Sequence, residues 1–217
     1  EGGDIFRFVM KREGWDFAET LRYLADKAGV QLSPRTQESS ADESHKEALR
    51  QVLEEAVQFF RRQMLETDEG RQALDYLHQR GLSDETIKIW GLGYAPSSWN
   101  ALGSALQRKG YNQSLLESAG LITLREDGTS YDRFRQRLMF PIRDTYGKMA
   151  GFGGRILFSE DQTAAKYINS PRTDLFDKGG LLYGLDMARR EIRKSEQAVI
   201  VEGYMDVIGL HQAGFHN

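Results

Sequence analysis

The sequence lacks cysteine altogether, which excludes disulfide bonds and any metal site built on thiolates. It also lacks an apolar run near the roughly 20 residues that a membrane-spanning helix needs, and its first residues do not form a signal peptide. Neither sign of charge dominates, because the formal net charge is only -3. We therefore expect a cytoplasmic protein with no membrane partner, in which any surface for a polyanion must be local.

Helical patterns fill the first half of the chain. Apolar residues at helical spacing follow capping residues at Asp4 and Asp16, and they predict two short helices that end near Gly29. Residues 33–44 are rich in serine and in charged side chains, so we expect a linker and a domain boundary there. Helical spacing then resumes over residues 45–120.

The character of the sequence changes after residue 120. β-branched and aromatic residues, glycines and alternation dominate residues 121–182, which predicts a mixed sheet with hairpin turns at Asp127-Gly128 and Tyr146-Gly147. A helix after Tyr183, the apolar run 198–201 and a helix over 205–213 follow, in the order of an α/β unit built on a buried strand. We expect an α+β fold: a helical N-terminal part, the sheet, and the start of this α/β unit.

Arginines recur at alternate positions of the strand expected over residues 133–143. Period-two geometry would place them on one face and the apolar side chains on the other. Guanidinium groups at this density match phosphate oxygens, although a solvated face whose arginines pair with carboxylates explains the pattern equally well. The arginines of this row are Arg133, Arg135, Arg137 and Arg143.

Two further segments carry groups suited to nucleic acid. A run of glycines before Arg155 lets the backbone approach a ligand, although a β-bulge would also use them. Lys166, Tyr167 and Asn169 can contact phosphate, stack on a base and hydrogen-bond a sugar, and Lys178 follows in the next polar loop. For each segment taken alone, a purely structural role is the simpler interpretation.

Glu202 follows the apolar run 198–201, so it would stand at the carboxyl end of a strand, where open α/β sheets bind ligands. A carboxylate there can hold Mg²⁺ or act as a general base, and Asp206 lies about one helical turn later. A helix cap and a surface aspartate would explain the same two residues. Mg²⁺ sites for phosphoryl transfer draw on more than one carboxylate, and no second acidic pair at a strand end follows.

Taken in order, these segments resemble the polymerase domain of bacterial DNA primases, the DnaG family. Residues 1–32 resemble the end of the zinc-binding domain of that family. Residues 45–217 resemble the first part of its RNA polymerase domain: a helical part to residue 120, a basic-groove subdomain to residue 182, and the start of a Toprim fold. The segments that carry the resemblance are FRQRLMFPIRD (134–144), GFGGR (151–155), KYINSP (166–171), LYGL (182–185) and VEGYMDV (201–207).

The resemblance implies template-directed synthesis of short RNA primers on single-stranded DNA from ribonucleoside triphosphates. Glu202 would be the catalytic residue that begins the metal site, Asp206 would follow it, and the ion would be Mg²⁺ or Mn²⁺. Zn²⁺ would belong to the preceding domain, a replicative helicase would bind a further C-terminal domain, and the protein would be a monomer. The positions that match the family's basic groove are Arg137, Arg155, Lys166, Tyr167, Asn169 and Lys178.

Two positions depart from the family pattern. Arg172 stands where an acidic residue is usual, and Asp177 stands where histidine is common. Both lie in the loop expected on the nucleotide side, so they leave its local charge open. Because the family's zinc ligands and its downstream carboxylates do not occur in these 217 residues, we expect the chain to be inactive in primer synthesis by itself.

Two other functions fit part of the pattern. Another Toprim enzyme, a topoisomerase or a nuclease, would share only the segment around Glu202. A non-catalytic module that binds single-stranded DNA would use the arginine row alone. Loss of primer synthesis on neutralising Glu202 would separate the enzyme from the binding module.

Overall fold

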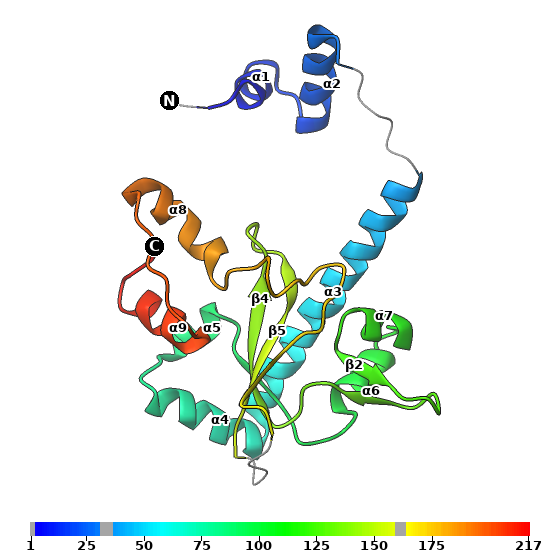
Figure 1. Ribbon diagram of the computed structural model, residues 1–217, viewed down its shortest axis with the longest axis vertical. Coiled ribbons are helices and arrows are strands. Elements are labelled where there is room, and N and C mark those ends of the chain that lie inside the picture. Colours follow the sequence, from blue (N-terminus) through cyan, green and yellow to red (C-terminus); the bar gives the residue numbers. More distant parts are fainter. Residues whose placement is uncertain (1–2, 31–36, 159–163) are drawn as a thin grey trace. The chain divides into compact units, whose positions relative to one another are not determined.

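The computed structural model describes residues 3–30, 37–158 and 164–217. The chain divides into two compact units, residues 1–43 and residues 44–217 (Figure 1). The division falls inside the segment that the sequence predicted as a linker.

The first unit contains two short helices, α1 (Ile5–Glu13) and α2 (Phe17–Ala28), as predicted. Asp4 caps α1, and Asp16 forms a reciprocal capping box with Glu19 at the start of α2. Both helices end on a glycine in the left-handed conformation, which a residue without a side chain adopts at no steric cost. Local capping chemistry is therefore enough to set the limits of both helices.

The segment predicted as a linker is partly helical. Residues 37–44 form the first turns of the 30-residue helix α3 (Gln37–Glu66), while residues 33–36 lie outside the described residues. Glutamine, glutamate and alanine are good helix formers, and a helix that is already anchored by packing extends at little cost per residue. The anchor here is the buried stretch of α3 that begins at Leu49.

Four shorter helices follow: α4 (Asp68–Gln79), α5 (Asp84–Ile89), α6 (Ala101–Arg108) and α7 (Gln113–Ser118). The side chains of Thr67, Ser83 and Asn112 cap α4, α5 and α7, as expected for these residue types. Helix α6 takes its cap from elsewhere in the chain, because the carboxylate of Asp132 accepts hydrogen bonds of 2.7 and 2.9 Å from backbone N–H groups in its first turn. No helix in the described part of the chain combines the length and apolarity needed to cross a membrane.

A four-stranded sheet, in the order β1-β4-β5-β6, forms the centre of the second unit. Its strands are β1 (Gly93–Ala95), β4 (Arg137–Arg143), β5 (Met149–Ile156) and β6 (Tyr167–Asn169). A separate hairpin joins β2 (Ile122–Leu124) to β3 (Ser130–Asp132). Both predicted hairpin turns are confirmed, with Gly128 and Gly147 at φ values of 81° and 79°.

The α+β class is confirmed, with two corrections. Every strand pair in the described residues is antiparallel, so the sheet is not mixed; tight hairpins can join only antiparallel neighbours, whereas parallel strands need a long crossover. Strand β1 lies in a region that the sequence predicted as helical. Three residues are too few to show alternation, and all three are buried, so the strand carries no sequence signal of its own.

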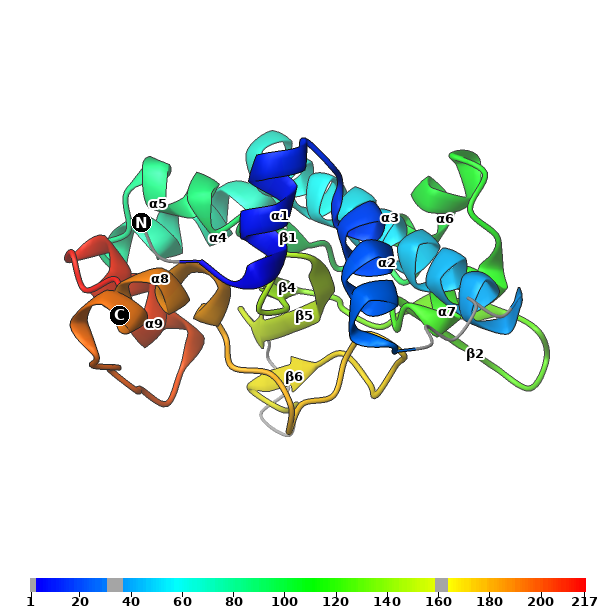
Figure 2. The same cartoon turned by 90° about the horizontal axis from the view of Figure 1, so that it is seen from above.

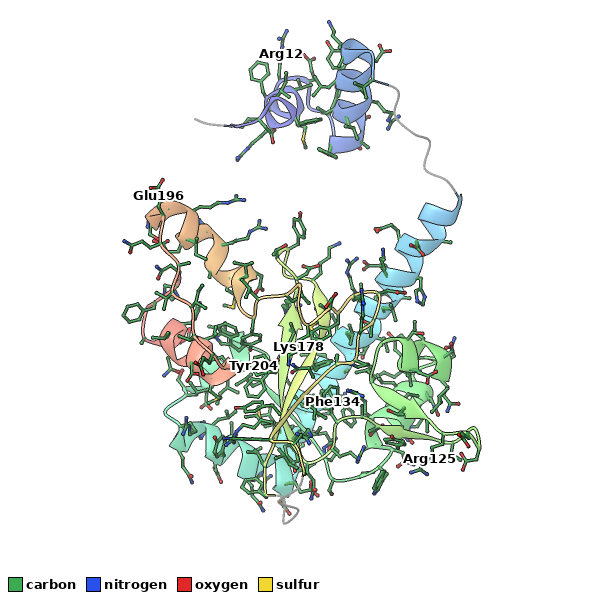
Figure 3. All side chains as sticks on the ribbon, in the orientation of Figure 1. Arg12, Arg125, Phe134, Lys178, Glu196 and Tyr204 are labelled. Atoms are coloured by element: carbon green, nitrogen blue, oxygen red, sulfur yellow. The ribbon has the colours of Figure 1, made fainter. Side chains whose placement is uncertain are left out.

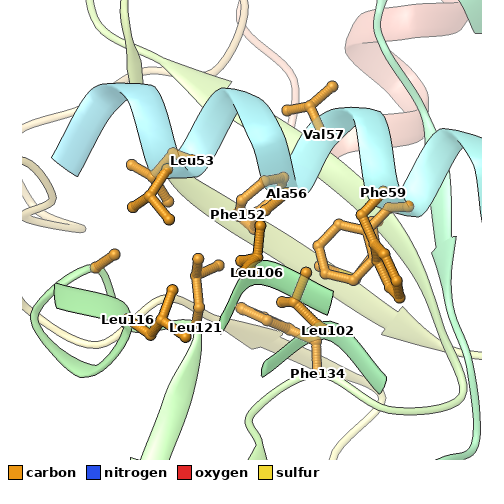
Figure 4. Close-up of a cluster of buried hydrophobic side chains, with 14 of the residues drawn as sticks. Leu53, Ala56, Val57, Phe59, Leu102, Leu106, Leu116, Leu121, Phe134 and Phe152 are labelled. Carbon is orange, nitrogen blue, oxygen red and sulfur yellow. The ribbon is translucent and has the colours of Figure 1, made fainter. Parts of the chain in front are cut away.

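The main core of the second unit lies between α3 and the sheet (Figure 4). Apolar side chains of α3 pack on β5 and on α6, and the rings of Phe60 and Phe152 meet edge to face with centroids 5.4 Å apart. Helices α6 and α7 with the β2–β3 hairpin flank one side of the sheet, and the C-terminal helices flank the other (Figures 1 and 2).

The C-terminal segment contains the two predicted helices, α8 (Leu185–Ser195) and α9 (Tyr204–Gln212), but the strand expected between them is absent. Residues 198–201 have no strand pairing, and Ile200 is 83% exposed. An apolar run forms a buried strand only where neighbouring strands satisfy its backbone, and the described residues offer it none. The start of the α/β unit is therefore present as its helices alone.

Candidate nucleic-acid and metal site

The predicted row of arginines on one strand face is wrong. Strand β4 begins only at Arg137, so Arg133 and Arg135 precede it, and both faces of the strand are packed against apolar side chains. Arg137 itself is 7% exposed, and its Nη1 donates to the backbone carbonyls of Gly154 and Ala165 at 3.2 and 3.0 Å. Burial lowers the pKa of Arg137 from its ordinary value. This guanidinium therefore connects β5 to the segment that precedes β6.

The other arginines of the predicted row also have protein partners. Arg133 donates through Nε and Nη2 to the backbone carbonyl of Asn169 at 3.2 and 3.1 Å. Arg135 donates to the backbone carbonyl of Asp132, and its guanidinium lies 4.1 Å from the ring centroid of Trp99. Arg143 forms a two-bond pair with the carboxylate of Glu54, at 2.6 and 3.1 Å. The alternative of a solvated face paired with carboxylates holds for Arg143 alone, because the other three arginines bind backbone carbonyls.

Arg155 is in a different position. It lies near the end of β5, directly opposite Tyr167 of β6, and its guanidinium lies over the ring of Tyr76 at 4.7 Å from the centroid. Its Nη1 is buried and has no hydrogen-bond partner among the described residues. Burial raises the pKa of Tyr167, and the Arg155 cation opposes that rise, so the phenol and the guanidinium are neighbours.

The two candidate lysines are more exposed than the candidate arginines. Lys166 and Lys178 are exposed, and neither forms an ion pair with a described carboxylate. The two departures from the family pattern lie close to Lys178 and compensate each other, since Nη2 of Arg172 lies 3.7 Å from Oδ2 of Asp177. Both of these side chains are exposed, so the pair adds little stability, but it leaves the charge of Lys178 uncancelled.

The run of glycines before Arg155 exists for close packing. None of its glycines has a positive φ among the described backbone angles, so the backbone conformation does not require glycine. A Cβ atom on Gly153 would lie 2.6 Å from the ring of Tyr204, and one on Gly154 would lie 2.9 Å from the ring of Phe134. The bare backbone of β5 therefore lets two aromatic rings pack onto the sheet from its two faces.

Tyr204 contacts the candidate residues but was not predicted as one of them. Its ring stacks on Phe140 with centroids 5.0 Å apart and planes 16° apart, and its hydroxyl donates to Oδ1 of Asn169 at 2.7 Å. Burial raises the pKa of Tyr204 to about 12, so the hydroxyl stays protonated as a donor. The only signal was its place between the two acidic residues Glu202 and Asp206, next to a glycine.

A cavity of about 930 Å³ brings five of the eleven candidate residues together. Tyr167, Asn169 and Lys178 line one part of it, and Glu202 and Asp206 line another. Arg155 and Lys166 do not line the cavity but adjoin Tyr167. Figure 3 shows Lys178 and Tyr204 near the β4–β5 hairpin and Arg125 at the far tip of the β2–β3 hairpin.

The acidic residues of the cavity lie at the start of α9. Glu202 precedes the helix, Asp206 lies in its first turn, and both are exposed. Two accessible carboxylates are the oxygen donors that Mg²⁺ prefers, and this ion commonly uses one or two of them together with water and substrate phosphates. The described residues contain no group of three or more acidic, histidine or cysteine side chains that could hold a metal ion. The donor set therefore fits Mg²⁺ in part and offers no zinc site.

Comparisons with known proteins point to one family. The family model described as the DNA primase catalytic core, N-terminal domain, matches residues 59–189. The chain is 46% identical to a DNA primase of Deinococcus radiodurans over 214 residues, which cover 98% of this chain and 35% of that primase. It therefore spans only about a third of the length of this relative.

Two solved structures are similar to this chain. The Aquifex aeolicus primase, solved with its zinc-binding and RNA polymerase domains, has a TM-score of 0.71 and 33% identity, and the match covers 100% of this chain and 51% of that one. A DnaG primase catalytic domain bound to single-stranded DNA has a TM-score of 0.69 and 40% identity, with 80% of this chain and 53% of that one covered. Because the family model matches more than half of its residues, the chain belongs to the family of DNA primase catalytic cores.

Proposed function

We propose that this chain is part of a primase that synthesises short RNA primers on single-stranded DNA from ribonucleoside triphosphates. The observation that carries the proposal is the cavity, which places Lys178, Tyr167 and Asn169 in one space with the carboxylates of Glu202 and Asp206. Template-directed nucleotide addition needs these two kinds of group together, cations and rings to hold nucleic acid and carboxylates to hold a metal ion.

The nucleic-acid part of the site consists of accessible cations around one aromatic ring. Lys166, Lys178 and Arg155 would contact phosphates, the exposed face of Tyr167 would stack on a base, and Asn169 would hydrogen-bond a base or sugar edge. Tyr167 is 40% exposed, so a base can reach its ring. The single-stranded DNA in the similar DnaG structure supports this assignment.

The metal part consists of Glu202 and Asp206, which would hold Mg²⁺ or Mn²⁺ with further oxygen ligands. Such an ion supplies charge stabilisation at a phosphate that undergoes substitution. The chain itself would fix the two carboxylates through the first turn of α9 and the packing of Tyr204. Because the described residues provide only these two ligands, we expect the 217-residue chain to bind DNA without making primers.

The remaining assignments follow from family membership. Residues 1–32 would be the end of a zinc-binding domain, as the coverage of the Aquifex aeolicus primase supports, and Zn²⁺ would belong to that domain. Residues 45–120 and 121–182 would form the helical and basic-groove parts of the polymerase domain, and residues 183–217 the start of the Toprim fold. A replicative helicase would bind elsewhere in the longer protein, which would act as a monomer in the cytoplasm.

Two other functions remain to be separated by experiment. Another Toprim enzyme would share the Glu202 segment, but the match over residues 59–189 lies outside that segment and favours a primase. A non-catalytic module for single-stranded DNA would need an accessible arginine row, and the partners of Arg137 and Arg143 remove most of that row.

The test is primer synthesis by the longer gene product on a single-stranded DNA template with labelled ribonucleoside triphosphates and Mg²⁺. We expect Glu202→Gln to abolish synthesis while leaving template binding intact, because the change removes charge and preserves volume. Glu196→Gln makes the same substitution outside the cavity and should remain active. Full activity of the Glu202→Gln enzyme would overturn the metal role, and loss of folding would show as a lowered unfolding midpoint.

A further inference from the structure

Arg155 differs from the other candidate arginines in how it is held. Arg133, Arg137 and Arg143 donate hydrogen bonds to carbonyl or carboxylate oxygens of the protein. Arg155 forms no ion pair with a described carboxylate, and its Nη1 has no hydrogen-bond partner among the described residues. Its orientation therefore depends on neighbouring aromatic side chains, including a hydrogen bond with the phenol of Tyr167.

The ring of Tyr76 supplies a second aromatic contact to Arg155. Tyr76 lies near the end of α4 and is half-buried, and the Arg155 guanidinium carbon lies 4.7 Å from its ring centroid. Tyr167 lies beside the same guanidinium from the neighbouring strand β6. The two tyrosines also interact electrostatically, since Tyr76 contributes to the raised pKa of Tyr167. Arg155 thus has one aromatic neighbour from a helix and one from a strand.

We propose that Tyr76 is a positioning residue for nucleic-acid binding, which holds the planar guanidinium of Arg155 by a cation–π contact and itself uses none of its N–H donors. This inference rests on the proposed function and adds to it a residue that no sequence motif indicated.

The physical reason lies in the difference between a ring and an oxygen as a partner for arginine. A carboxylate or carbonyl consumes N–H donors and, if charged, cancels the cation. The face of an aromatic ring attracts the cation through its quadrupole and uses none of the donors in the guanidinium plane. A side chain ordered in this way loses less entropy when a phosphate binds.

The test is fluorescence anisotropy of the 217-residue chain with a labelled single-stranded oligodeoxynucleotide at several salt concentrations. Tyr76→Leu removes the ring and keeps apolar volume, Tyr76→Phe keeps the ring, and Arg155→Ala removes the cation. The matched control is Tyr146→Leu, because Tyr146 also lies under a guanidinium, that of Arg189 at 5.7 Å, but Arg189 is not among the candidate nucleic-acid-binding residues.

We expect Tyr76→Leu to weaken binding by about threefold to tenfold. Tyr76→Phe and Tyr146→Leu should bind like the unsubstituted chain. The double variant Tyr76→Leu/Arg155→Ala should bind like Arg155→Ala alone, because the ring acts only through the guanidinium. Additive losses in the double variant, or unchanged binding by Tyr76→Leu, would overturn the inference.

A second substitution keeps the test decisive if Tyr76→Leu does not fold, as judged by circular dichroism. Arg155→Lys preserves the charge but replaces the planar group by an ammonium, which a ring orients less well. We expect it to lose most of the affinity that Arg155→Ala loses, and full affinity would overturn the inference. If Arg155→Ala itself binds normally, the groove assignment of the proposed function fails; if it binds weakly and the Tyr76 variants do not, only this inference fails.

Discussion

The hydroxyl of Tyr204 donates a 2.7 Å hydrogen bond to Oδ1 of Asn169, and this bond joins two parts of the cavity that are 35 residues apart in the sequence. Asn169 ends β6, whereas Tyr204 begins α9 between Glu202 and Asp206. The position of the two carboxylates relative to the side chains proposed to bind nucleic acid therefore depends on Tyr204 and on its stacking against Phe140 of β4.

Tyr204→Phe should lower the free energy of unfolding by about 1 kcal/mol, because it removes the bond to Asn169 and keeps the ring stacked on Phe140. Urea unfolding of the chain measures the change. Tyr146→Phe is the control, since Tyr146 is 79% exposed and should give an unchanged midpoint. Equal midpoints for the two variants would show that the Tyr204 bond adds no stability.

Gly153→Ala should be more damaging than loss of that bond. The added Cβ would lie 2.6 Å from the Tyr204 ring, so the ring must move off the sheet, at a cost of about 1–3 kcal/mol. Gly209→Ala in α9 is the opposite case, because no atom lies within 4 Å of its Cβ position and alanine favours a helix. Thermal unfolding should rank Gly209→Ala at or above the unsubstituted chain and Gly153→Ala below it; the reverse order would contradict the packing role.

The features that the sequence predicted well are local ones. The caps at Asp4 and Asp16 and the turns at Gly128 and Gly147 depend on residues within a few positions of each other, and the structure has all of them. Their chemistry needs no knowledge of the rest of the chain.

The arginine row failed because the fate of a guanidinium is set by partners far away in the sequence. Glu54, which binds Arg143, is 89 residues distant, and the carbonyls that bind Arg137 lie in and beyond the next strand. Alternation predicts which side of a strand a residue faces but not what lies opposite it. Tyr76 was missed for the same reason, because its proposed role depends on Arg155, which lies far away in the sequence.

The distinction between paired and accessible cations predicts different effects for Arg143 and Lys178. Lys178→Ala should weaken binding of single-stranded DNA and reduce the slope of log affinity against log salt by about 0.7, as for one lost phosphate contact. Arg143→Ala should leave that slope unchanged but lower the unfolding free energy, since it leaves Glu54 without its partner. Anisotropy titrations and urea unfolding of both variants test this difference. A reduced salt slope for Arg143→Ala would show that Arg143 contacts a phosphate despite its pairing with Glu54.

Asp132 predicts an unusual dependence of stability on pH. Its carboxylate is 2% exposed, and burial raises its pKa from 3.8 to about 6, although the two N–H groups of α6 and the charge of Arg135 oppose the rise. Between about pH 4 and pH 6 the folded chain therefore binds a proton at this site that the unfolded chain does not. The contribution of this proton to stability is complete below pH 4 and is lost as the pH rises through 6.

The measurement is the unfolding free energy of the chain and of Asp132→Asn between pH 4 and pH 7. Asparagine does not titrate, so whatever it changes in the hydrogen bonds to α6 affects stability equally at every pH. Subtracting the two curves isolates Asp132 from the other acidic residues. We expect the advantage of the unsubstituted chain to fall by on the order of 3 kcal/mol across this range, whereas parallel curves would mean that Asp132 titrates normally despite its burial.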